Sequence, residues 1–298
     1  MGAGAGRVRA THQRAGVMTD RMDGIDWDDA LANAPYIEAA ESYPDAWAAK
    51  AAAFRERARG DLDIAYGAAD RERLDLFRPE TTPKGLVVFV HGGYWLRFDK
   101  SYWSYLAQGP IAKGWAVALP SYTLAPAVRL PRITEQIAGA IECAAGRVAG
   151  PIILTGHSAG GHLVTRMLCP DVVLSARQRI AHVLSISGLH DLRPLLAARM
   201  NEELQLSEKT ALAESPALHH PAPDTPVTIW VGGHERPEFL RQSALLREAW
   251  GGLGCDARLV VDGTRHHFDV ISGLEHPESL LTRTLLNPKH REAANAEA

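Results

Sequence analysis

Residues 151–168 read PIILTGHSAGGHLVTRML and join a short apolar run, a glycine-rich turn and a helical segment. The apolar run is typical of a strand covered on both faces, because such a strand has no solvent-facing side for polar residues. The turn places Ser158 between Gly156 and Gly160 in the pattern G-x-S-x-G. A sharp strand-to-helix turn needs glycines beside the serine, whose hydroxyl it holds at the end of the strand. The pattern in this context predicts that Ser158 is a nucleophile.

Apolar runs and amphipathic segments alternate along most of the chain. We expect strands at residues 64–66, 74–77, 86–90, 116–120, 151–154, 183–186, 227–231 and 258–261. We expect helices at residues 103–113, 133–148, 159–168, 237–250 and 278–286. Strands that alternate with helices of this length form parallel βαβ units. The predicted fold class is therefore α/β, with a doubly wound, mostly parallel sheet and helices on both faces.

The same pattern divides the chain into one domain with two polar ends. Residues 27–288 hold the predicted elements as a single domain, in which residues 27–60 form an N-terminal helical cap segment. The aromatic residues that share one helical face of this cap segment are Tyr43, Trp47 and Phe54. We expect residues 1–26 to be a disordered leader and residues 289–298 to be a polar tail that frays. Residues 190–225 exceed a simple crossover and are expected to add short helices that supply a lid or pocket wall.

Composition excludes several classes of partner. The 298-residue chain has 32 Lys and Arg against 35 Asp and Glu, so its formal charge is −3. Nucleic acids and anionic membranes require clustered positive charge, so neither is an expected partner. The three cysteines show no CxxC spacing, which predicts reduced thiols and a cytoplasmic protein. His219 and His220 lack partners at metal-ligand spacing, and no metal site is expected.

A second motif, HGGYW at residues 91–95, directly follows a predicted strand. Hydrolysis of an acyl group passes through an oxyanion, which paired glycines can stabilise because they let backbone N–H groups approach it. The HGGG-type loop of lipases and esterases has this role, together with the amide that follows the nucleophile. The predicted donors are the backbone amides of Gly92, Gly93 and Ala159. The aromatic residues that follow either form a wall for a planar substrate or simply pack, and they are Tyr94 and Trp95.

A general base and an orienting carboxylate should follow in the chain order serine, acid, histidine. The last predicted strand leads to His266 and His267, one of which we expect to be the base. The strand before it leads into GGHERP, where Glu235 is the only carboxylate. Asp262 and Asp269 lie closer to the histidines in the sequence and are alternative partners for the base.

Six segments carry a resemblance to a known family. They are HGGYW at 91–95, SYTLAP at 121–126, GHSAGGHL at 156–163, SGLHDLRPL at 187–195, GGHERPEF at 232–239 and HHFDVI at 266–271. Together they resemble an α/β-hydrolase of the hormone-sensitive-lipase-like group, and more narrowly the arylformamidase (kynurenine formamidase) branch. The resemblance extends over residues 74–286, and the combination is far more specific than any one motif.

This resemblance implies a catalytic triad of Ser158, Glu235 and His267. His267 is preferred over His266 because Phe-Asp follows it, as in the family's D-H-F-D-I-I ending. The sequence departs from the family pattern in two places: Glu235 stands where the formamidases usually have Asp, and the acidic residue before the base is absent, with Arg265 and His266 there instead. Glu also serves as the triad acid in α/β-hydrolases, so both departures are compatible with hydrolysis.

The expected protein is a serine hydrolase that removes a formyl or short acyl group from an arylamide or ester through an acyl-enzyme. By resemblance, the first candidate substrate is N-formylkynurenine, and no metal or organic cofactor is needed. The alternative is a short-chain carboxylesterase or thioesterase, which would use the same catalytic residues. A non-catalytic binding protein with this fold is less favoured, because such proteins usually lose a triad residue. The expected partner is a small-molecule acyl substrate, and a homodimer is compatible with the sequence.

Overall fold

The computed structural model describes residues 1, 24–222 and 224–287. Most of the leader predicted at residues 1–26, and the tail predicted at 289–298, lie outside the described residues. One sheet has the strand order β1-β2-β4-β3-β5-β6-β7-β8. Its strands are β1 (Gly60–Ala65), β2 (Arg73–Phe77), β3 (Leu86–Val90), β4 (Ala116–Pro120), β5 (Ile152–His157), β6 (Ile180–Ile186), β7 (Val227–Gly232) and β8 (Ala257–Asp262).

The sheet is mostly parallel, as the sequence predicts. β2 pairs antiparallel with both β1 and β4, whereas every pair from β4 through β3 to β8 is parallel. The parallel strands therefore end at one edge of the sheet, where the loops after β3, β5, β7 and β8 converge. In open α/β sheets, ligands bind at this carboxyl edge.

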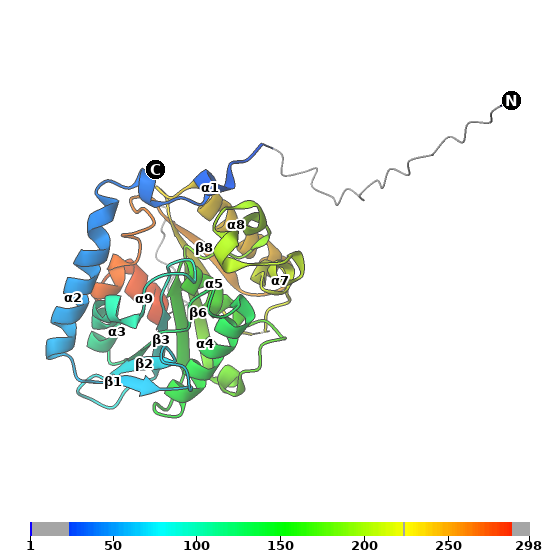
Figure 1. Ribbon diagram of the computed structural model, residues 1–298. Helices are drawn as coiled ribbons and strands as arrows, with labels where there is room; N and C mark the ends of the chain where they lie inside the picture. Colours follow the sequence, from blue (N-terminus) through cyan, green and yellow to red (C-terminus); the bar gives the residue numbers. More distant parts are fainter. Residues whose placement is uncertain (2–23, 223, 288–298) are drawn as a thin grey trace.

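Helices cover both faces of the sheet (Figure 1). The longer helices are α2 (Tyr43–Arg57), α4 (Leu130–Ala145), α5 (Ala159–Arg166), α8 (Pro237–Gly252) and α9 (Leu280–Leu286). The short ones are α1 (Trp27–Ala30), α3 (Gln108–Ala112), α6 (Asn201–Leu204) and α7 (Glu208–Ala213). The helices α4, α5 and α8 pack on one face, and α2, α3 and α9 pack on the other. Within the described residues, no helix is both long and apolar enough to cross a membrane.

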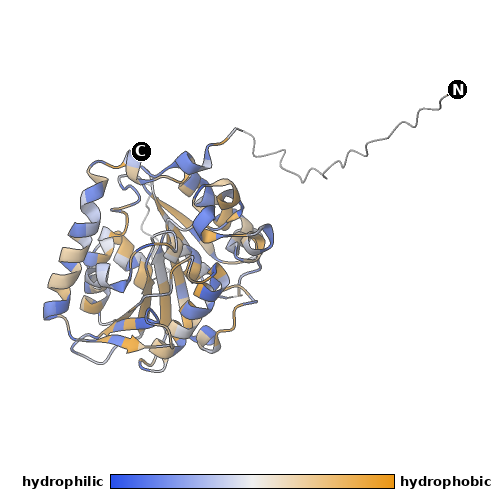
Figure 2. Cartoon of the chain, in the orientation of Figure 1, coloured by the Kyte–Doolittle hydropathy of each residue, from blue (hydrophilic) through white to orange (hydrophobic). Residues whose placement is uncertain are grey.

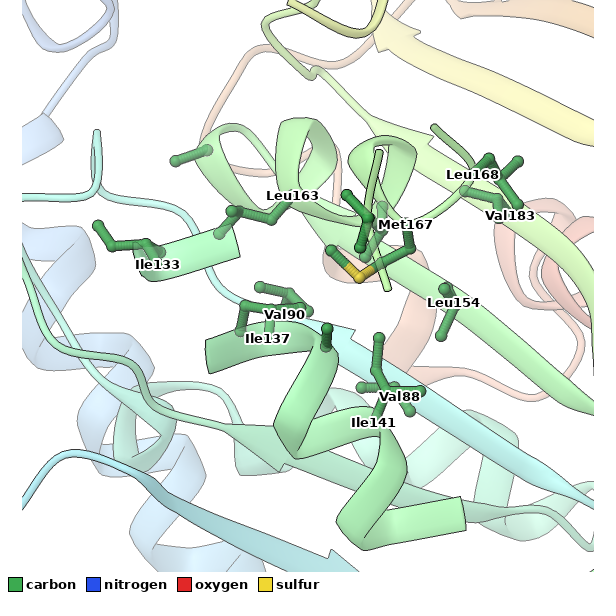
Figure 3. Close-up of a cluster of buried hydrophobic side chains, with 14 of the residues drawn as sticks. Val88, Val90, Ile133, Ile137, Ile141, Leu154, Leu163, Met167, Leu168 and Val183 are labelled. Carbon is green, nitrogen blue, oxygen red and sulfur yellow. The ribbon is translucent and has the colours of Figure 1, made fainter. Parts of the chain in front are cut away.

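Alternate residues of each central strand feed two separate cores, because successive side chains point to opposite faces of a sheet. In β3, Val88 and Val90 pack with α4 and α5, whereas Val87 and Phe89 pack with α2 and α9. Figure 3 shows the first core, in which isoleucines of α4 meet β3 and β5. The central strands are accordingly mostly hydrophobic, whereas hydrophilic residues are frequent on the outlying helices (Figure 2).

One predicted helix is mostly replaced by shorter turns. Residues 103–113 contain a 3₁₀ turn at Ser104–Ala107, and the α-helix α3 begins only at Gln108. Pro110 accounts for the late start of the helix. It has no N–H to donate to a carbonyl of the preceding turn, so it disrupts the interior of a helix, but it fits in the first turn. The prediction of one continuous helix here is therefore wrong.

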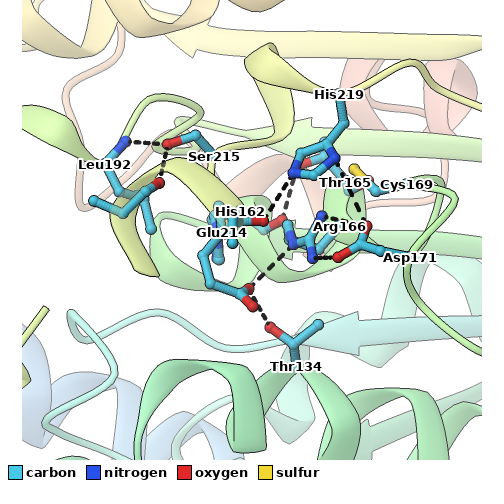
Figure 4. Close-up of polar contacts among 12 residues, drawn as sticks. Thr134, His162, Thr165, Arg166, Cys169, Asp171, Leu192, Glu214, Ser215 and His219 are labelled. Carbon is cyan, nitrogen blue, oxygen red and sulfur yellow. Dashed lines mark hydrogen bonds and ion pairs between the residues drawn. The ribbon is translucent and has the colours of Figure 1, made fainter. Parts of the chain in front are cut away.

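The helix that follows the nucleophile is fixed by a buried ionic network (Figure 4). Arg166, the last residue of α5, is 1% exposed and donates from Nε to the Glu214 carboxylate at 3.1 Å. Glu214 also accepts the hydroxyl of Thr134 on α4 at 2.7 Å. Removing one partner of such a buried pair costs roughly 3–5 kcal/mol, because it leaves a charge without compensation. This network therefore holds α5, and the turn before it, in a fixed place.

Candidate active site

Ser158 occupies the sharp turn between β5 and α5. Its backbone has φ 56° and ψ −118°, a conformation that L-residues rarely adopt, and the residue is 3% exposed. Neighbouring glycines make the turn sterically feasible: a Cβ on Gly156 would lie 2.4 Å from the Gly160 carbonyl oxygen, and one on Gly160 would lie 1.9 Å from that of Val90. Strain of this kind costs about 1–3 kcal/mol and is common at functional sites. The geometry is that of a nucleophile elbow.

The loops after β7 and β8 bring an acid and a base together. Oε2 of Glu235 lies 2.6 Å from Nδ1 of His267, and both side chains are almost fully buried. The other carboxylate oxygen, Oε1, accepts the backbone N–H of Gly232 at 2.8 Å and the hydroxyl of Ser187. Because both oxygens are occupied, Glu235 is held in one orientation and fixes that of the imidazole.

The other candidate acids have different partners. Asp269 accepts the backbone N–H of His266 at 2.8 Å and the guanidinium of Arg265 at 3.1 Å. Asp262 accepts the hydroxyl of Thr264 at 3.4 Å. His266 turns toward the cap segment, where its Nε2 lies 3.1 Å from the hydroxyl of Tyr43. Of the candidate acids and bases that the sequence leaves open, Glu235 and His267 are therefore the two that form a hydrogen-bonded pair.

Two rings lie against the imidazole of His267. The ring centroid of Phe239 is 4.4 Å away, and that of His157 is 4.6 Å away. Burial and the nearby His267 hold the pKa of His157 well below its usual range, so His157 is a neutral ring at physiological pH. Packing by rings adds a second constraint on the imidazole besides its bond to Glu235.

The predicted oxyanion loop lies beside the nucleophile. A Cβ on Gly92 would lie 2.8 Å from the His157 carbonyl oxygen and 3.0 Å from the Cβ of Ser158. Gly93 has φ +107°, and its carbonyl accepts the amide of Arg97 in a tight turn at 3.0 Å. Ala159 is the first residue of α5, where backbone amides have no acceptor inside the helix.

A cavity of about 620 Å³ opens over these residues. Its wall includes Ser158, His267, Gly92 and Gly93, so the predicted nucleophile, base and oxyanion loop share one space. Further wall residues come from the segment before α2 and from the region at 190–225, including Leu31, Asn33 and Met200. Pockets of this size suit small organic ligands.

The two aromatic residues of the HGGYW motif have different environments. Tyr94 lines the cavity, and its hydroxyl donates to the Leu31 carbonyl oxygen at 2.5 Å. Trp95 is fully buried, and its ring stands edge-on to that of His162 at 5.1 Å between centroids. The structure therefore brings Tyr94 to the candidate substrate site and places Trp95 in the core beneath it, because the tight turn after Gly93 directs the two side chains apart.

Sequence reasoning missed Ser187 as a site residue. Its hydroxyl holds the carboxylate of Glu235, and its backbone has a positive φ of 52° at the end of β6. The signal was present in the segment SGLHDLRPL, which carries part of the family resemblance. A serine at a strand's carboxyl end, beside the strand that precedes the acid, is the feature that could have revealed it.

One cluster outside this site has the residue types of a metal site. Ligand atoms of Cys169, Asp171 and His219 lie within 4.8 Å of one another. Arg166, however, binds both carboxylate oxygens of Asp171, at 3.1 and 2.5 Å (Figure 4). Burial raises the pKa of the Cys169 thiol to about 11, whereas a metal binds the thiolate. A guanidinium already neutralises this cluster, which therefore does not fit a cation.

The mostly parallel eight-stranded sheet, the strained serine turn and the buried acid–histidine pair define the α/β-hydrolase class. A family model described as the alpha/beta hydrolase family matches residues 87–288, and the chain belongs to this family. This confirms the predicted fold class.

Relatives also match in sequence along most of the chain. Kynurenine formamidase of Danio rerio is 30% identical over 236 residues, which cover 76% of this chain and 80% of the relative. Kynurenine formamidase of Drosophila melanogaster is 28% identical over 243 residues, with coverages of 75% and 80%. These matches confirm the family resemblance that the motifs suggested.

A solved structure from Silicibacter sp. TM1040, provisionally described as a thioesterase, is 52% identical. It covers 89% of this chain and all of its own, with a TM-score of 0.85. A structure described as an arylesterase has a TM-score of 0.61 at 19% identity, which supports the fold alone. The protein is a serine hydrolase of the α/β-hydrolase family.

Proposed function

We propose that this hydrolase removes a formyl group from an N-formyl arylamine, with N-formylkynurenine as its first candidate substrate. The observation that carries the proposal is the bond of 2.6 Å between Glu235 and His267 at the wall of a cavity that also contains Ser158. This arrangement has the parts of a serine-based acyl transfer. The kynurenine formamidases among the relatives supply the candidate substrate.

In the proposed reaction, Oγ of Ser158 attacks the formyl carbon while Nε2 of His267 accepts the hydroxyl proton. Glu235 stabilises the resulting imidazolium through Nδ1. The carbonyl oxygen becomes an anion that accepts hydrogen bonds from the amides of Gly93 and Ala159, with the amide of Gly92 as the third candidate donor. Pre-organised donors of this kind contribute roughly 10²–10³-fold in rate.

The second half of the reaction releases both products. His267 gives its proton to the amine nitrogen as the C–N bond breaks, and a formyl ester remains on Ser158. A water molecule then loses a proton to His267 and attacks this ester. Formate leaves, and the proton returns to the serine oxygen. No metal or organic cofactor takes part.

The shape of the cavity favours a planar leaving group. Its wall contains several aromatic rings, contributed by Trp47, Tyr94, Phe98, Trp103 and Phe268. Aromatic rings gain about 0.5–1.5 kcal/mol per favourable ring contact beyond the burial of area. An aryl amine would therefore gain affinity in this cavity that an alkyl leaving group would not.

Charged groups of both signs also line the cavity: Arg97 is basic, and Asp28, Glu41 and Glu203 are acidic. All four residues are exposed, as expected for side chains at an open mouth. A substrate that carries both a carboxylate and an ammonium group would find partners of each sign there. N-formylkynurenine carries both groups on its amino-acid side chain.

The second candidate is a short-chain carboxylesterase or thioesterase. The 52% identical structure with a provisional thioesterase description favours it. The same catalytic groups would serve, and only the leaving group would differ. We further expect the enzyme to act in the cytoplasm on small acyl substrates, without nucleic-acid or membrane partners; a homodimer remains compatible with this proposal.

Parallel kinetics on the purified protein test the proposal. The substrates are N-formylkynurenine, p-nitrophenyl acetate and acetyl-coenzyme A, each measured with wild type and with Ser158→Ala. We expect kcat/KM for the formamide of about 10⁴ M⁻¹s⁻¹ or more, lost in the variant. Turnover of the ester or thioester alone would replace the formamidase proposal with the second candidate.

A further inference from the structure

The segment from α1 to the start of α2 forms part of the cavity wall. Residues 27–44, here called the N-terminal wall, contribute Leu31, Asn33, Pro35 and Glu41 among others. They precede the sheet in sequence, yet they face the nucleophile and base across the cavity. Contacts with the loops at the carboxyl edge of the sheet must therefore hold this segment in place.

One connection comes from the residue that follows the candidate acid. Nη2 of Arg236 lies 2.5 Å from Oδ2 of Asp29, and the guanidinium lies 3.6 Å above the ring of Tyr36. The hydroxyl of Tyr36 in turn donates to Oδ1 of Asp29 at 2.5 Å. Arg236, Asp29 and Tyr36 thus form a closed group that ties the N-terminal wall to the loop of Glu235.

A second connection reaches the oxyanion loop. The hydroxyl of Tyr94 donates to the Leu31 carbonyl oxygen at 2.5 Å, and burial raises the pKa of Tyr94, so this hydroxyl stays protonated. The N-terminal wall is consequently attached to the acid loop by an ion pair with a cation–π contact, and to the oxyanion loop by a hydrogen bond. An exposed ion pair alone is worth about 0–1 kcal/mol, but a guanidinium stacked on an aromatic ring adds to it.

We infer that Arg236 is a positioning residue that fixes the N-terminal wall over the substrate cavity, so that this wall determines affinity for the leaving group. In this arrangement the acyl group reacts at Ser158, and a bulky leaving group would extend through the cavity toward the N-terminal wall. Loosening the wall should therefore weaken binding of large substrates and leave small ones unaffected. This inference concerns the leaving-group site and does not depend on whether the acyl group is formyl or acetyl.

The test compares KM and kcat for a large and a small ester, p-nitrophenyl acetate and ethyl acetate, in Arg236→Met and Asp29→Asn. For p-nitrophenyl acetate, we expect KM to rise about tenfold and kcat to stay within about twofold of wild type. KM for ethyl acetate should not change. This pattern is expected when a variant loses binding energy that the ground state and the transition state share equally. Asp29→Asn breaks the same contact from the wall's side and leaves Arg236 beside Glu235. The matched control is Lys113→Met, which removes another ion pair of 2.5 Å, to Glu278, away from the cavity.

Hydrogen exchange supplies a readout that needs no activity. Amides of residues 31–44 should exchange faster in Arg236→Met and Asp29→Asn than in wild type or Lys113→Met. Equal KM effects on both esters, a fall in kcat without a change in KM, or unchanged exchange at residues 31–44 would each overturn the inference. A failure of the proposed function would look different. In that case N-formylkynurenine would not be hydrolysed, but the expected changes in ester KM and in hydrogen exchange would still be observed.

Discussion

Oε2 of Glu235 lies 2.6 Å from Nδ1 of His267, although 32 residues separate the two in the chain. Their proximity follows from strand order: β7 and β8 are parallel neighbours, and Gly232 at the end of one pairs with Asp262 at the end of the other. The loops that carry acid and base therefore leave the sheet side by side. Gly232 keeps this approach open, because a Cβ there would lie 2.3 Å from the Arg265 carbonyl oxygen.

Glu235→Gln should lower kcat by about 10³–10⁴-fold, because an amide in place of the carboxylate neither stabilises the imidazolium nor fixes the required tautomer. Asp262→Asn is the matched control and should keep most of the activity. Steady-state kinetics on whichever substrate turns over will check this. The assignment of the acid fails if Asp262→Asn is the inactive variant and Glu235→Gln is not.

Ser187→Ala should lower kcat/KM by about tenfold or more, because loss of one hydrogen bond to a buried carboxylate costs roughly 1.5–3 kcal/mol. The effect should appear mainly in kcat, since Ser187 acts through Glu235. Ser243→Ala is a suitable control: Ser243 is a buried serine whose hydroxyl has no hydrogen-bond partner within the described residues. Equal activities of the two variants would show that the Ser187 hydroxyl does not support the acid.

Gly92→Ala should leave the protein folded and reduce kcat by about 10²-fold or more, as expected when an oxyanion donor is displaced. The new Cβ would lie 2.8 Å from the His157 carbonyl oxygen, so the loop must shift away from Ser158. Gly251→Ala on α8 provides the control, because nothing lies within 4 Å of a Cβ there. Circular dichroism shows whether each variant is folded, and kinetics show whether catalysis is lost. Full activity of Gly92→Ala would argue against this loop as the oxyanion site.

The free energy of unfolding should decrease as the pH drops below about 6.5. Burial lowers the pKa of His91 and His182 to about 4, and of His162 and His190 to about 3. The pKa values of these histidines are lower in the folded state than in the unfolded state. The unfolded chain therefore binds more protons, and lowering the pH stabilises it relative to the folded protein. Each such histidine costs about 2 kcal/mol of stability at pH 5 relative to neutral pH.

Urea unfolding at about pH 7.5 and pH 5 measures this difference. His182 is the residue to remove, because it lies outside the cavity wall and bonds the Leu285 carbonyl at 2.9 Å and Thr228 at 3.0 Å. His182→Gln should be less stable at neutral pH but lose about 2 kcal/mol less on acidification. An unfolding free energy that is the same at both pH values would contradict the lowered pKa values.

Local sequence patterns predicted the elements that the sheet depends on. Continuous apolar runs located β3, β4 and β7 within a residue or so, because strands buried on both faces admit few polar residues. The glycines around Ser158 predicted the strained turn, since only glycine fits against the neighbouring backbone. Chain order then narrowed the acid and base to a few residues near the ends of β7 and β8.

Features that depend on tertiary packing were not accessible in this way. The different environments of Tyr94 and Trp95 depend on the tight turn after Gly93, in which both residues have positive φ angles that the motif does not reveal. The contact between Ser187 and Glu235 requires the adjacency of β6 and β7, and the contact between Arg236 and Asp29 spans 207 residues. Pairings at such separations are set by the assembled sheet and not by any local pattern.

The most direct test of the account is covalent labelling of the protein with a fluorophosphonate, followed by peptide mass spectrometry. We expect one adduct per chain, on the peptide that contains Ser158, and none in Ser158→Ala. Labelling should slow by about 10³-fold in His267→Ala, because the serine then lacks its base. An adduct on a different serine, or hydrolysis that persists in Ser158→Ala, would contradict the assignment of Ser158 as the nucleophile.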